Sequence, residues 1–260
     1  MKWHVFVAKF SHASFRFLKN LAKLLDALFS GFWLGVMSRK SLEYSDELFY
    51  HKTRHYTEDR YNQSGLYKWE KAAVEKHFPK AKSLLLIAAG GGREVLALSK
   101  MGFDVDSYEC NRTLIEYGNG LLQKNGIRNK IKYLPRNSFP VEIEKYDGII
   151  IGWGAYSLMP GTKNRISFLT GLYPFLKTEA PLMISFLYTG RKSRNDRMIK
   201  NVSNFFRFFC NRERTEPGDR LVPEFIHYFT EEEIKNELIQ SNYRIIDYYT
   251  TEYGCVIAGV

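Results

Sequence analysis

The residues best suited to chemistry lie in a glycine-rich turn and in an acid that follows it. The turn, Ala88-Ala89-Gly90-Gly91-Gly92, comes after the apolar run that begins at Ser83 and before a stretch with helical spacing that begins at Arg93. Backbone amides of such a turn can approach a ligand closely, and the start of a helix favours electron-rich groups. Glu109 ends the next expected strand, where a carboxylate can accept hydrogen bonds from both hydroxyls of a ribose. This order predicts a site for a nucleoside-containing cofactor.

The spacing of the glycines narrows the kind of cofactor. A nicotinamide or flavin enzyme would carry GxGxxG, but Gly90 and Gly92 are followed by Val95 where the third glycine would stand. Over about residues 81–260 the sequence resembles the class I S-adenosylmethionine-dependent methyltransferases, whose first motif is an apolar strand running into an acid, an apolar residue and GxGxG. The resemblance implies S-adenosylmethionine as the cofactor.

The resemblance also assigns cofactor-binding positions. It places Ala88, Gly90 and Gly92 at the three glycine positions and Glu109 at the ribose. It further implies an adenine pocket at Cys110, Asn137 and Ser138, and contacts beside the methionine moiety at Gly152 and Trp153. Leu86 stands where the family often has an acid, and Ala88 replaces the first glycine, which an alanine tolerates where φ stays negative.

Several further residues are candidates for catalysis or acceptor binding. His227 and Tyr156 are the catalytic candidates: His227 as a general base, with a capping or packing histidine as the alternative, and Tyr156 beside the methyl group. Tyr61 and Asn62 lie upstream of the first strand, where such enzymes often fold a cap over the substrate. Arg191 could hold an anionic group of the acceptor, with a solvated basic loop as the alternative.

These residues need a scaffold, and the chain predicts an α/β, Rossmann-like doubly wound fold. Apolar strands expected at 83–89, 104–109, 130–134, 148–151 and 181–187 alternate with helices, among them 112–124 and 165–176. Thr230 and Glu233 form a capping box for the last helix. Strands at 243–249 and 253–259 are close enough in sequence to pair only antiparallel, which predicts a seven-stranded, mostly parallel sheet with an antiparallel C-terminal strand.

Three parts of the chain are expected. They are a basic amphipathic N-terminal segment at 1–40, a helical cap at 41–80, in which Ser45 would cap a helix from Asp46, and a methyltransferase core at 81–260 with an insertion at 188–225. The insertion is long enough to act as a lid or a binding element.

The positive charge is concentrated in the first part. Residues 1–40 hold seven Lys and Arg against one acid, Asp26, and so +6 of the formal net charge of +10, which leaves +4 for the other 220 residues. That small excess disfavours nucleic acid as a partner. From Phe17 to Phe32 the apolar spacing is helical, but the apolar stretch is shorter than the ~20 residues of a membrane span. The helix therefore lies on an anionic membrane surface or docks on the main domain or a partner, and both remain open.

The number and spacing of the cysteines exclude two kinds of site. Cys110, Cys210 and Cys255 are odd in number and far apart, so we expect no disulfide framework and no metal site. We also expect a cytoplasmic protein with an optional peripheral membrane contact.

The predicted reaction is methyl transfer to an oxygen or nitrogen of a small-molecule, glycan or lipid-linked acceptor. An RNA methyltransferase and a non-catalytic cofactor-binding scaffold are the alternatives, and the oligomeric state is open.

Overall fold

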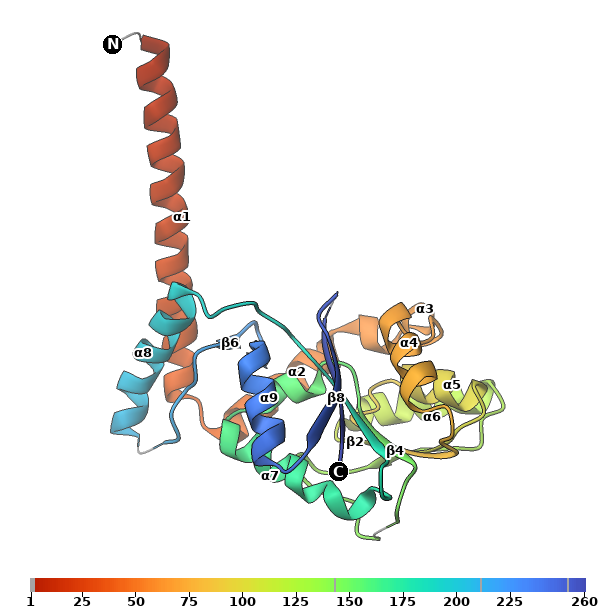
Figure 1. Ribbon diagram of the computed structural model, residues 1–260. Helices are drawn as coiled ribbons and strands as arrows, with labels where there is room; N and C mark the ends of the chain where they lie inside the picture. The colour runs from red at the N-terminus through yellow and green to blue at the C-terminus, as the bar shows by residue number, and fades with distance from the viewer. Residues whose placement is uncertain (1–2, 143, 211, 252) are drawn as a thin grey trace.

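The protein is built around one seven-stranded sheet (Figure 1). The computed structural model describes residues 3–142, 144–210, 212–251 and 253–260. The strand order is β3-β2-β1-β4-β5-β9-β8, and β9 runs antiparallel to both of its neighbours. The bounds are β1 Ser83–Ile87, β2 Asp104–Glu109, β3 Ile131–Tyr133, β4 Gly148–Ile151, β5 Pro181–Phe186, β8 Arg244–Tyr249 and β9 Gly254–Gly259. The predicted fold class is confirmed.

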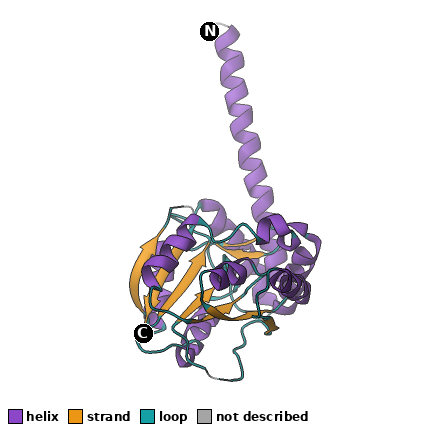
Figure 2. Ribbon diagram, turned by 90° about the vertical axis from the view of Figure 1, so that its right-hand side faces the viewer, coloured by secondary structure: helices purple, strands orange, loops and turns teal. Residues whose placement is uncertain are grey.

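Helices cover both faces of the sheet because the apolar side chains of the central strands point both ways (Figures 1 and 2). In β1, Leu84 and Leu86 pack with α4 (Lys68–His77), α5 (Arg93–Lys100) and α6 (Arg112–Lys124). Leu85 and Ile87 face the opposite core, which holds α7 (Thr162–Gly171) and α9 (Glu231–Gln240). The capping box of Thr230 and Glu233 starts α9 as predicted.

Four short helices precede the sheet. They are α2 (Arg39–Lys52), the 3₁₀ helix η1 (Arg54–Thr57), α3 (Asp59–Asn62) and α4. The expected start at Asp46 was wrong: α2 begins at Arg39, because the hydroxyl of Ser38 accepts a hydrogen bond from the amide of Ser41. Asp46 therefore lies in the middle of α2, with its side chain buried. After β4 come the 3₁₀ turn η2 (Ala155–Leu158) and α7, and the end of the expected helix forms a separate 3₁₀ turn, η3 (Tyr173–Phe175).

The segment between β5 and α9 contains a helix and two short strands. Ser193 and Asp196 form a capping box that starts α8 (Arg194–Phe209). Beyond α8, β6 (Asp219–Leu221) pairs antiparallel with β7 (Phe225–His227) in a small second sheet. Sequence patterns did not predict this hairpin, because its strands have three residues each, too few to show a period.

The N-terminal helix α1 (Trp3–Val36) projects from the body (Figures 1 and 2). Only its last part is buried, through Ala27, Ser30, Gly31, Leu34 and Gly35. This part lies against α8, and Leu34 joins Leu42, Ile199 and Phe225 in a small third core. Over the described residues no single helix meets both the length and the hydropathy needed to cross a bilayer, although α1 and α2, bent by 119° where they meet, do so as a pair.

Candidate cofactor and acceptor site

A cavity of about 260 Å³ opens at the carboxyl ends of the central strands. Its floor is formed by the segments that follow β1, β2, β3 and β4, and its other walls by α2, by residues 56–62 and by residues 224–226. Crevices at this edge of an open parallel sheet are where such folds bind ligands. The predicted site therefore coincides with a cavity that the fold builds.

The glycine-rich turn passes along the cavity with three left-handed residues. The φ angles are 62° at Ala88, 55° at Gly90 and 94° at Gly92. The expectation of a negative φ at Ala88 was wrong, and an alanine in this conformation costs roughly 1–2 kcal/mol. A Cβ placed on Gly90 would meet no atom within 4 Å, so this glycine leaves space that a ligand can fill. Gly92 does not line the cavity; it begins α5 and faces Gly118 of α6.

Glu109 is tied to the glycine-rich turn. One carboxylate oxygen accepts a hydrogen bond from the amide of Gly90 at 2.9 Å, and the other accepts from the amides of Cys110 at 2.7 Å and Asn111 at 2.9 Å. These bonds hold the side chain at the wall of the cavity, while the oxygen that accepts from Gly90 keeps acceptor capacity for a hydroxyl. The open space above Gly90 and this fixed carboxylate fit the ribose end of a nucleoside cofactor.

The remaining cofactor candidates divide into wall residues and packing residues. Cys110, Asn137, Ser138 and Trp153 line the cavity, and burial with the nearby Glu109 raises the pKa of the Cys110 thiol to about 12. Gly152 does not line it. A Cβ at Gly152 would lie 2.1 Å from the carbonyl oxygen of Ala88, so this glycine lets the ends of β1 and β4 pass each other.

A buried ion cluster that the sequence did not reveal supports this wall. The guanidinium of Arg93 donates to both oxygens of Glu70 at 2.6 and 2.7 Å and lies 2.9 Å from a carboxylate oxygen of Glu94. It also stacks 4.3 Å from the ring centre of Tyr67. Glu94 in turn accepts from the amide of Trp153 at 3.0 Å, so the cluster links α4 and α5 to the segment after β4.

α2 belongs to the expected helical cap at 41–80, but the side chains that it contributes to the cavity wall were not predicted from sequence. Asp46 accepts from Arg136 at 2.9 Å and from the amide of Phe225 at 3.1 Å, which joins α2 to β7 across the cavity. Burial raises the pKa of Asp46 to about 6, although the charge of Arg136 opposes this shift. Burial also raises the pKa of Tyr50, one helical turn further along α2.

Glu224 stands at the end of this wall, directly before β7. It is 9% exposed, and among the described residues its Oε2 atom has no hydrogen-bond partner. Burial raises the pKa of its carboxyl group, and the charge of Asp46 adds to that effect. No periodicity or spacing marked it, because it sits in a turn between two very short strands.

The two cap residues predicted to bind substrate do reach the cavity. Tyr61 and Asn62 line it, but the side-chain amide of Asn62 donates through Nδ2 to the carbonyl oxygens of Tyr56 at 3.0 Å and Glu58 at 3.1 Å. A Cβ on Gly91 would lie 2.4 Å from the same Tyr56 oxygen, so the cap crosses the glycine-rich turn at close range. Asn62 therefore shapes the cap, and direct contact with the acceptor remains a prediction for Tyr61.

The structure does not bring His227, Tyr156 and Arg191 to the cavity. Tyr156 is fully buried in η2 and donates to Glu237 at 2.6 Å. His227 is fully buried on β7, where Nδ1 lies 2.6 Å from Asp219, whereas its neighbours Phe225 and Ile226 line the cavity. Arg191 is exposed in the loop before α8. Neither catalytic candidate is placed to touch a ligand in the cavity.

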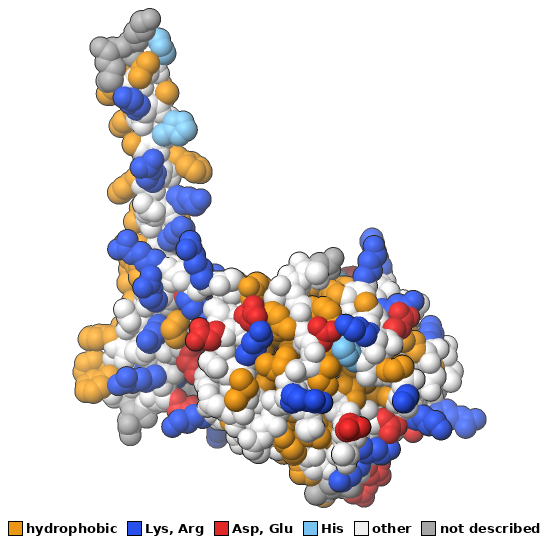
Figure 3. Space-filling model, viewed as in Figure 1, with side chains coloured by type: hydrophobic (Ala, Val, Ile, Leu, Met, Phe, Trp, Pro, Cys, Tyr) orange, Lys and Arg blue, Asp and Glu red, His pale blue; other side chains and the backbone are white. Residues whose placement is uncertain are grey.

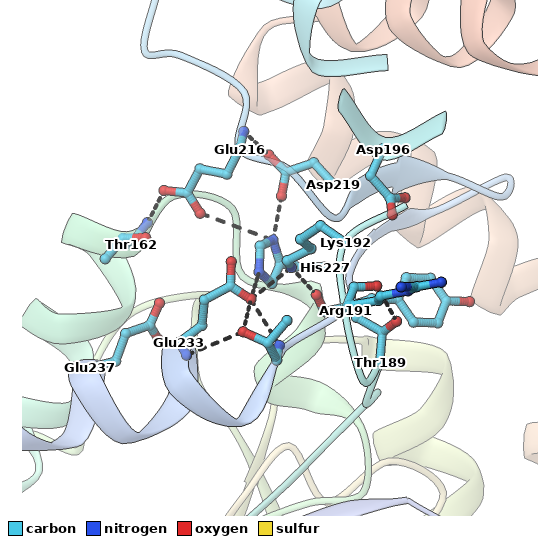
Figure 4. Close-up of polar contacts among 12 residues, drawn as sticks. Thr162, Thr189, Arg191, Lys192, Asp196, Glu216, Asp219, His227, Glu233 and Glu237 are labelled. Atoms are coloured by element: carbon cyan, nitrogen blue, oxygen red, sulfur yellow. Dashed lines mark hydrogen bonds and ion pairs between the residues drawn. The ribbon is translucent and has the colours of Figure 1, made fainter. Parts of the chain in front are cut away.

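His227 instead lies inside an ionic network (Figure 4). Arg165 pairs with Glu216 and Glu237 at 2.8 and 2.6 Å, and Lys192 pairs with Glu233 at 2.7 Å. Within the described chain, Glu216, Asp219 and His227 bring ligand atoms within 4.8 Å of one another, the kind of group that can hold a metal ion. Here these carboxylates already accept from Arg165, His227 and the amide of Glu216, so the network serves to join β6, β7, α7 and α9.

Comparison with known proteins agrees with this geometry. A family model described as tellurite resistance protein TehB matches residues 49–167. A relative from Caenorhabditis elegans, described as a lysine N-methyltransferase for an ATP synthase subunit, is 26% identical over 110 residues, which are 42% of this chain and 57% of the relative. The matched region thus spans little more than half the length of that relative.

Solved structures with low sequence identity share the fold. The 1,6-didemethyltoxoflavin-N1-methyltransferase of Burkholderia thailandensis, with bound 1,6-didemethyltoxoflavin and S-adenosylhomocysteine, gives a TM-score of 0.61 at 14% identity, covering 86% of this chain and 91% of that one. An S-adenosylmethionine-dependent methyltransferase from Methanosarcina mazei gives 0.56 at 16% identity, covering 75% and 98%. With the strand order described above, these matches show that the chain has the class I, Rossmann-like fold of the S-adenosylmethionine-dependent methyltransferases.

Proposed function

We propose that this protein methylates an amine nitrogen of its acceptor, and that Glu224 receives the acceptor's ammonium group. The observation that carries the proposal is the buried carboxylate of Glu224 at the wall of the cavity, whose Oε2 atom has no hydrogen-bond partner among the described residues. An ionised carboxylate that is buried without a partner costs several kcal/mol, and a bound cation removes that cost.

The other acids of the cavity differ from Glu224 because each has a partner. Glu43 pairs with Arg39, Asp46 with Arg136, Glu94 with Arg93, and Glu109 with three backbone amides. Among the described residues, the five acids that line the cavity face three arginines, Arg39, Arg93 and Arg136, and no lysine. The cavity therefore has an excess of negative charge, which favours a cationic acceptor over an anionic one.

Aromatic side chains on the cavity wall favour the same kind of acceptor. Tyr50, Tyr56, Tyr61 and Trp153 all line it. The faces of such rings attract ammonium groups by about 0.5–2 kcal/mol each. A hydroxyl acceptor would gain nothing comparable from this wall.

The division of labour among the residues follows from the chemistry of amines. S-adenosylmethionine supplies, when bound, a methyl group activated by the positive charge on its sulfur. The turn at Gly90 and the carboxylate of Glu109 are the residues that would hold the cofactor. An ammonium group has no free electron pair, so it must lose a proton before the nitrogen can react. Glu224 is suited to take that proton, because burial raises the pKa of its carboxyl group towards that of the amine.

The relative supports an amine acceptor in a limited way. Its description names a lysine N-methyltransferase, and a lysine side chain ends in a primary amine. This support concerns the class of acceptor atom. A small molecule, a glycan or a lipid-linked intermediate that carries an amine would satisfy the same site.

The proposal is tested with methyl-labelled cofactor and paired acceptors. Each pair holds a primary amine and the matching alcohol, such as a lysine-containing peptide and its hydroxynorleucine counterpart, and a polyamine and its diol. Label is expected on the amine of a pair. For that amine, Glu224→Gln should lower kcat/KM by about 100-fold or more, the range typical of a lost general base. S-adenosylhomocysteine binding should stay within twofold of wild type.

Glu43→Gln is the matched control, because Glu43 is an acid of the same wall that already pairs with Arg39. It should change kcat/KM by less than threefold. Label on the alcohols, or wild-type turnover of amines by Glu224→Gln, would overturn the amine proposal.

A further inference from the structure

We infer that α1, together with the exposed end of α8, attaches the protein to the surface of a membrane that contains anionic lipids. This inference concerns the part of the chain outside the cavity and is independent of the acceptor. We call the attaching surface the aromatic arm. It consists of the exposed apolar side chains of α1 together with Phe205, Phe208 and Phe209 of α8.

The two sides of α1 differ in character. At 3.6 residues per turn, the four Lys and Arg residues of α1 fall within about a quarter of the helix circumference. They are Lys9, Arg16, Lys19 and Lys23. The opposite side carries exposed large apolar residues, which are Trp3, Phe6, Phe10, Phe17, Leu21, Leu24, Leu25 and Leu28. Figure 3 shows the Lys and Arg side chains following one another along α1, with hydrophobic side chains at its edges. Such a helix lies in the plane of a membrane interface.

The contact between α1 and α8 leaves most of the apolar side of α1 exposed. The helices approach through small residues spaced four apart, Ala27, Gly31 and Gly35, and Phe32 packs against Phe206 at the edge of the contact. A Cβ on Gly31 would lie 2.7 Å from Cβ of Val202, and a Cβ on Gly35 would lie 2.7 Å from Cβ of Phe206. By the same helical geometry Ala27, Ser30 and Leu34 continue the basic side of α1, so the body holds the helix with its apolar side facing outward.

The apolar surface continues from α1 onto α8. Ring centres lie 5.3 Å apart for Phe32 and Trp33, 5.1 Å for Phe32 and Phe206, and 5.4 Å for Phe206 and Phe205. Beyond Phe205, the rings of Phe208 and Phe209 are 82% and 71% exposed. In Figure 3 hydrophobic side chains gather at the lower left, where Figure 1 places α8 beside the lower half of α1. Two elements far apart in sequence therefore share one exposed apolar surface.

An anionic bilayer is the occupant that this surface fits. Exposed apolar side chains extend along α1 from Trp3 to Trp33, whereas a soluble monomer usually exposes such residues singly or in small patches. A second copy could cover the apolar residues, but it would leave the basic side of α1 without opposite charges. Anionic lipid supplies the opposite charge, and Trp and Phe rings favour the interfacial layer. Along its sequence α1 carries charged residues between the apolar ones, so it suits the interface rather than the bilayer core. These charged residues are Lys9, Arg16, Lys19, Lys23 and Asp26.

The test uses the full chain in a flotation assay. Vesicles of phosphatidylcholine alone are compared with vesicles that contain 30% phosphatidylglycerol. Wild-type protein is expected to float with the anionic vesicles and to be released from them by alkaline carbonate. Leu21→Asp with Leu28→Asp should lower the partition coefficient at least tenfold. Lys19→Glu with Lys23→Glu should lower the partition coefficient on the anionic vesicles only, by about fivefold for each lysine lost.

Ile239→Asp is the matched control, since Ile239 is 61% exposed on α9, outside the aromatic arm. It should partition as wild type does. The folding of every variant is checked by S-adenosylhomocysteine binding, which does not involve α1. Failure of wild type to bind either vesicle would overturn the inference, as would unchanged binding by the leucine variant. A concentration-dependent dimer that the leucine variant abolishes, without vesicle binding, would identify a second copy as the occupant, and retention after carbonate would contradict attachment at the interface.

Discussion

Replacing Arg93 by methionine should destabilise the protein more than any change on its surface. Arg93 is 1% exposed and Glu70 is 3% exposed, and the two share two hydrogen bonds of 2.6 and 2.7 Å. Arg93 is also the cation that pairs with Glu94 and the donor to the carbonyl oxygen of Gly65. Methionine keeps most of the length and apolar volume of the side chain, so the change removes mainly charge and hydrogen bonds.

The expected loss follows from the buried charges left behind. Removing one partner of a buried ion pair costs about 3–5 kcal/mol, against a total stability of about 5–15 kcal/mol for a typical domain. Burial already raises the pKa of Glu70, while Arg93 opposes this shift. Without Arg93 the pKa of Glu70 in the folded protein should rise further. The folded state would then bind more protons than the unfolded state above about pH 4.3, so the deficit should grow as the pH rises from there.

Urea unfolding followed by tryptophan fluorescence measures this loss at pH 5 and pH 8. Lys71→Met is the control, because Lys71 pairs with Glu75 at 3.7 Å with both side chains more than half exposed. Such a pair contributes less than about 1 kcal/mol. A loss below about 1 kcal/mol in Arg93→Met, or an equal loss at both pH values, would refute the reasoning from buried charge.

Two further predictions concern titratable groups. Burial lowers the pKa of His227, but the hydrogen bond to Asp219 and the carboxylate of Glu233, 3.9 Å from Nε2, outweigh burial and raise it. The contribution of His227 to stability is therefore complete below about pH 6.5, and it is lost as the pH rises through the raised pKa of the folded state. The unfolding free energies measured at pH 6 and pH 9 should consequently differ less in His227→Phe than in wild type. Burial also raises the pKa of Cys110 and Cys255 to about 12, whereas Cys210 is exposed. A disulfide reagent at pH 8 should label Cys210 within minutes and leave the other two unmodified until the protein unfolds; fast labelling of three thiols would contradict this.

The parts of the fold that sequence predicts are those that need only local pattern. The buried strands read as apolar runs, the glycine-rich turn marks the step from β1 to α5, and the Thr230 capping box marks the start of α9. Glu109 was predictable because its place at the end of β2 fixes its position relative to the turn.

The missed residues are those whose role depends on packing between distant segments. Arg93 finds Glu70 only when α4 packs beside α5, and Asp46 meets Arg136 and Phe225 only when α2 closes over the sheet. Glu224 is isolated by burial, which leaves no trace in a sequence pattern. His227 was predicted from its place before the last helix, but its direction on β7 is set by the pairing with Asp219.

The central claim, that the turn at Gly90 and the acid at Glu109 hold S-adenosylmethionine, is tested most directly by calorimetric titration. S-adenosylhomocysteine is titrated into wild type, Gly90→Trp and Gly126→Trp. Both glycines have positive φ and open space at the Cβ position, but only Gly90 lines the cavity. We expect one binding site per chain in wild type and in Gly126→Trp, and no binding in Gly90→Trp. Binding that is undiminished in Gly90→Trp, or absent in wild type, would contradict the claim.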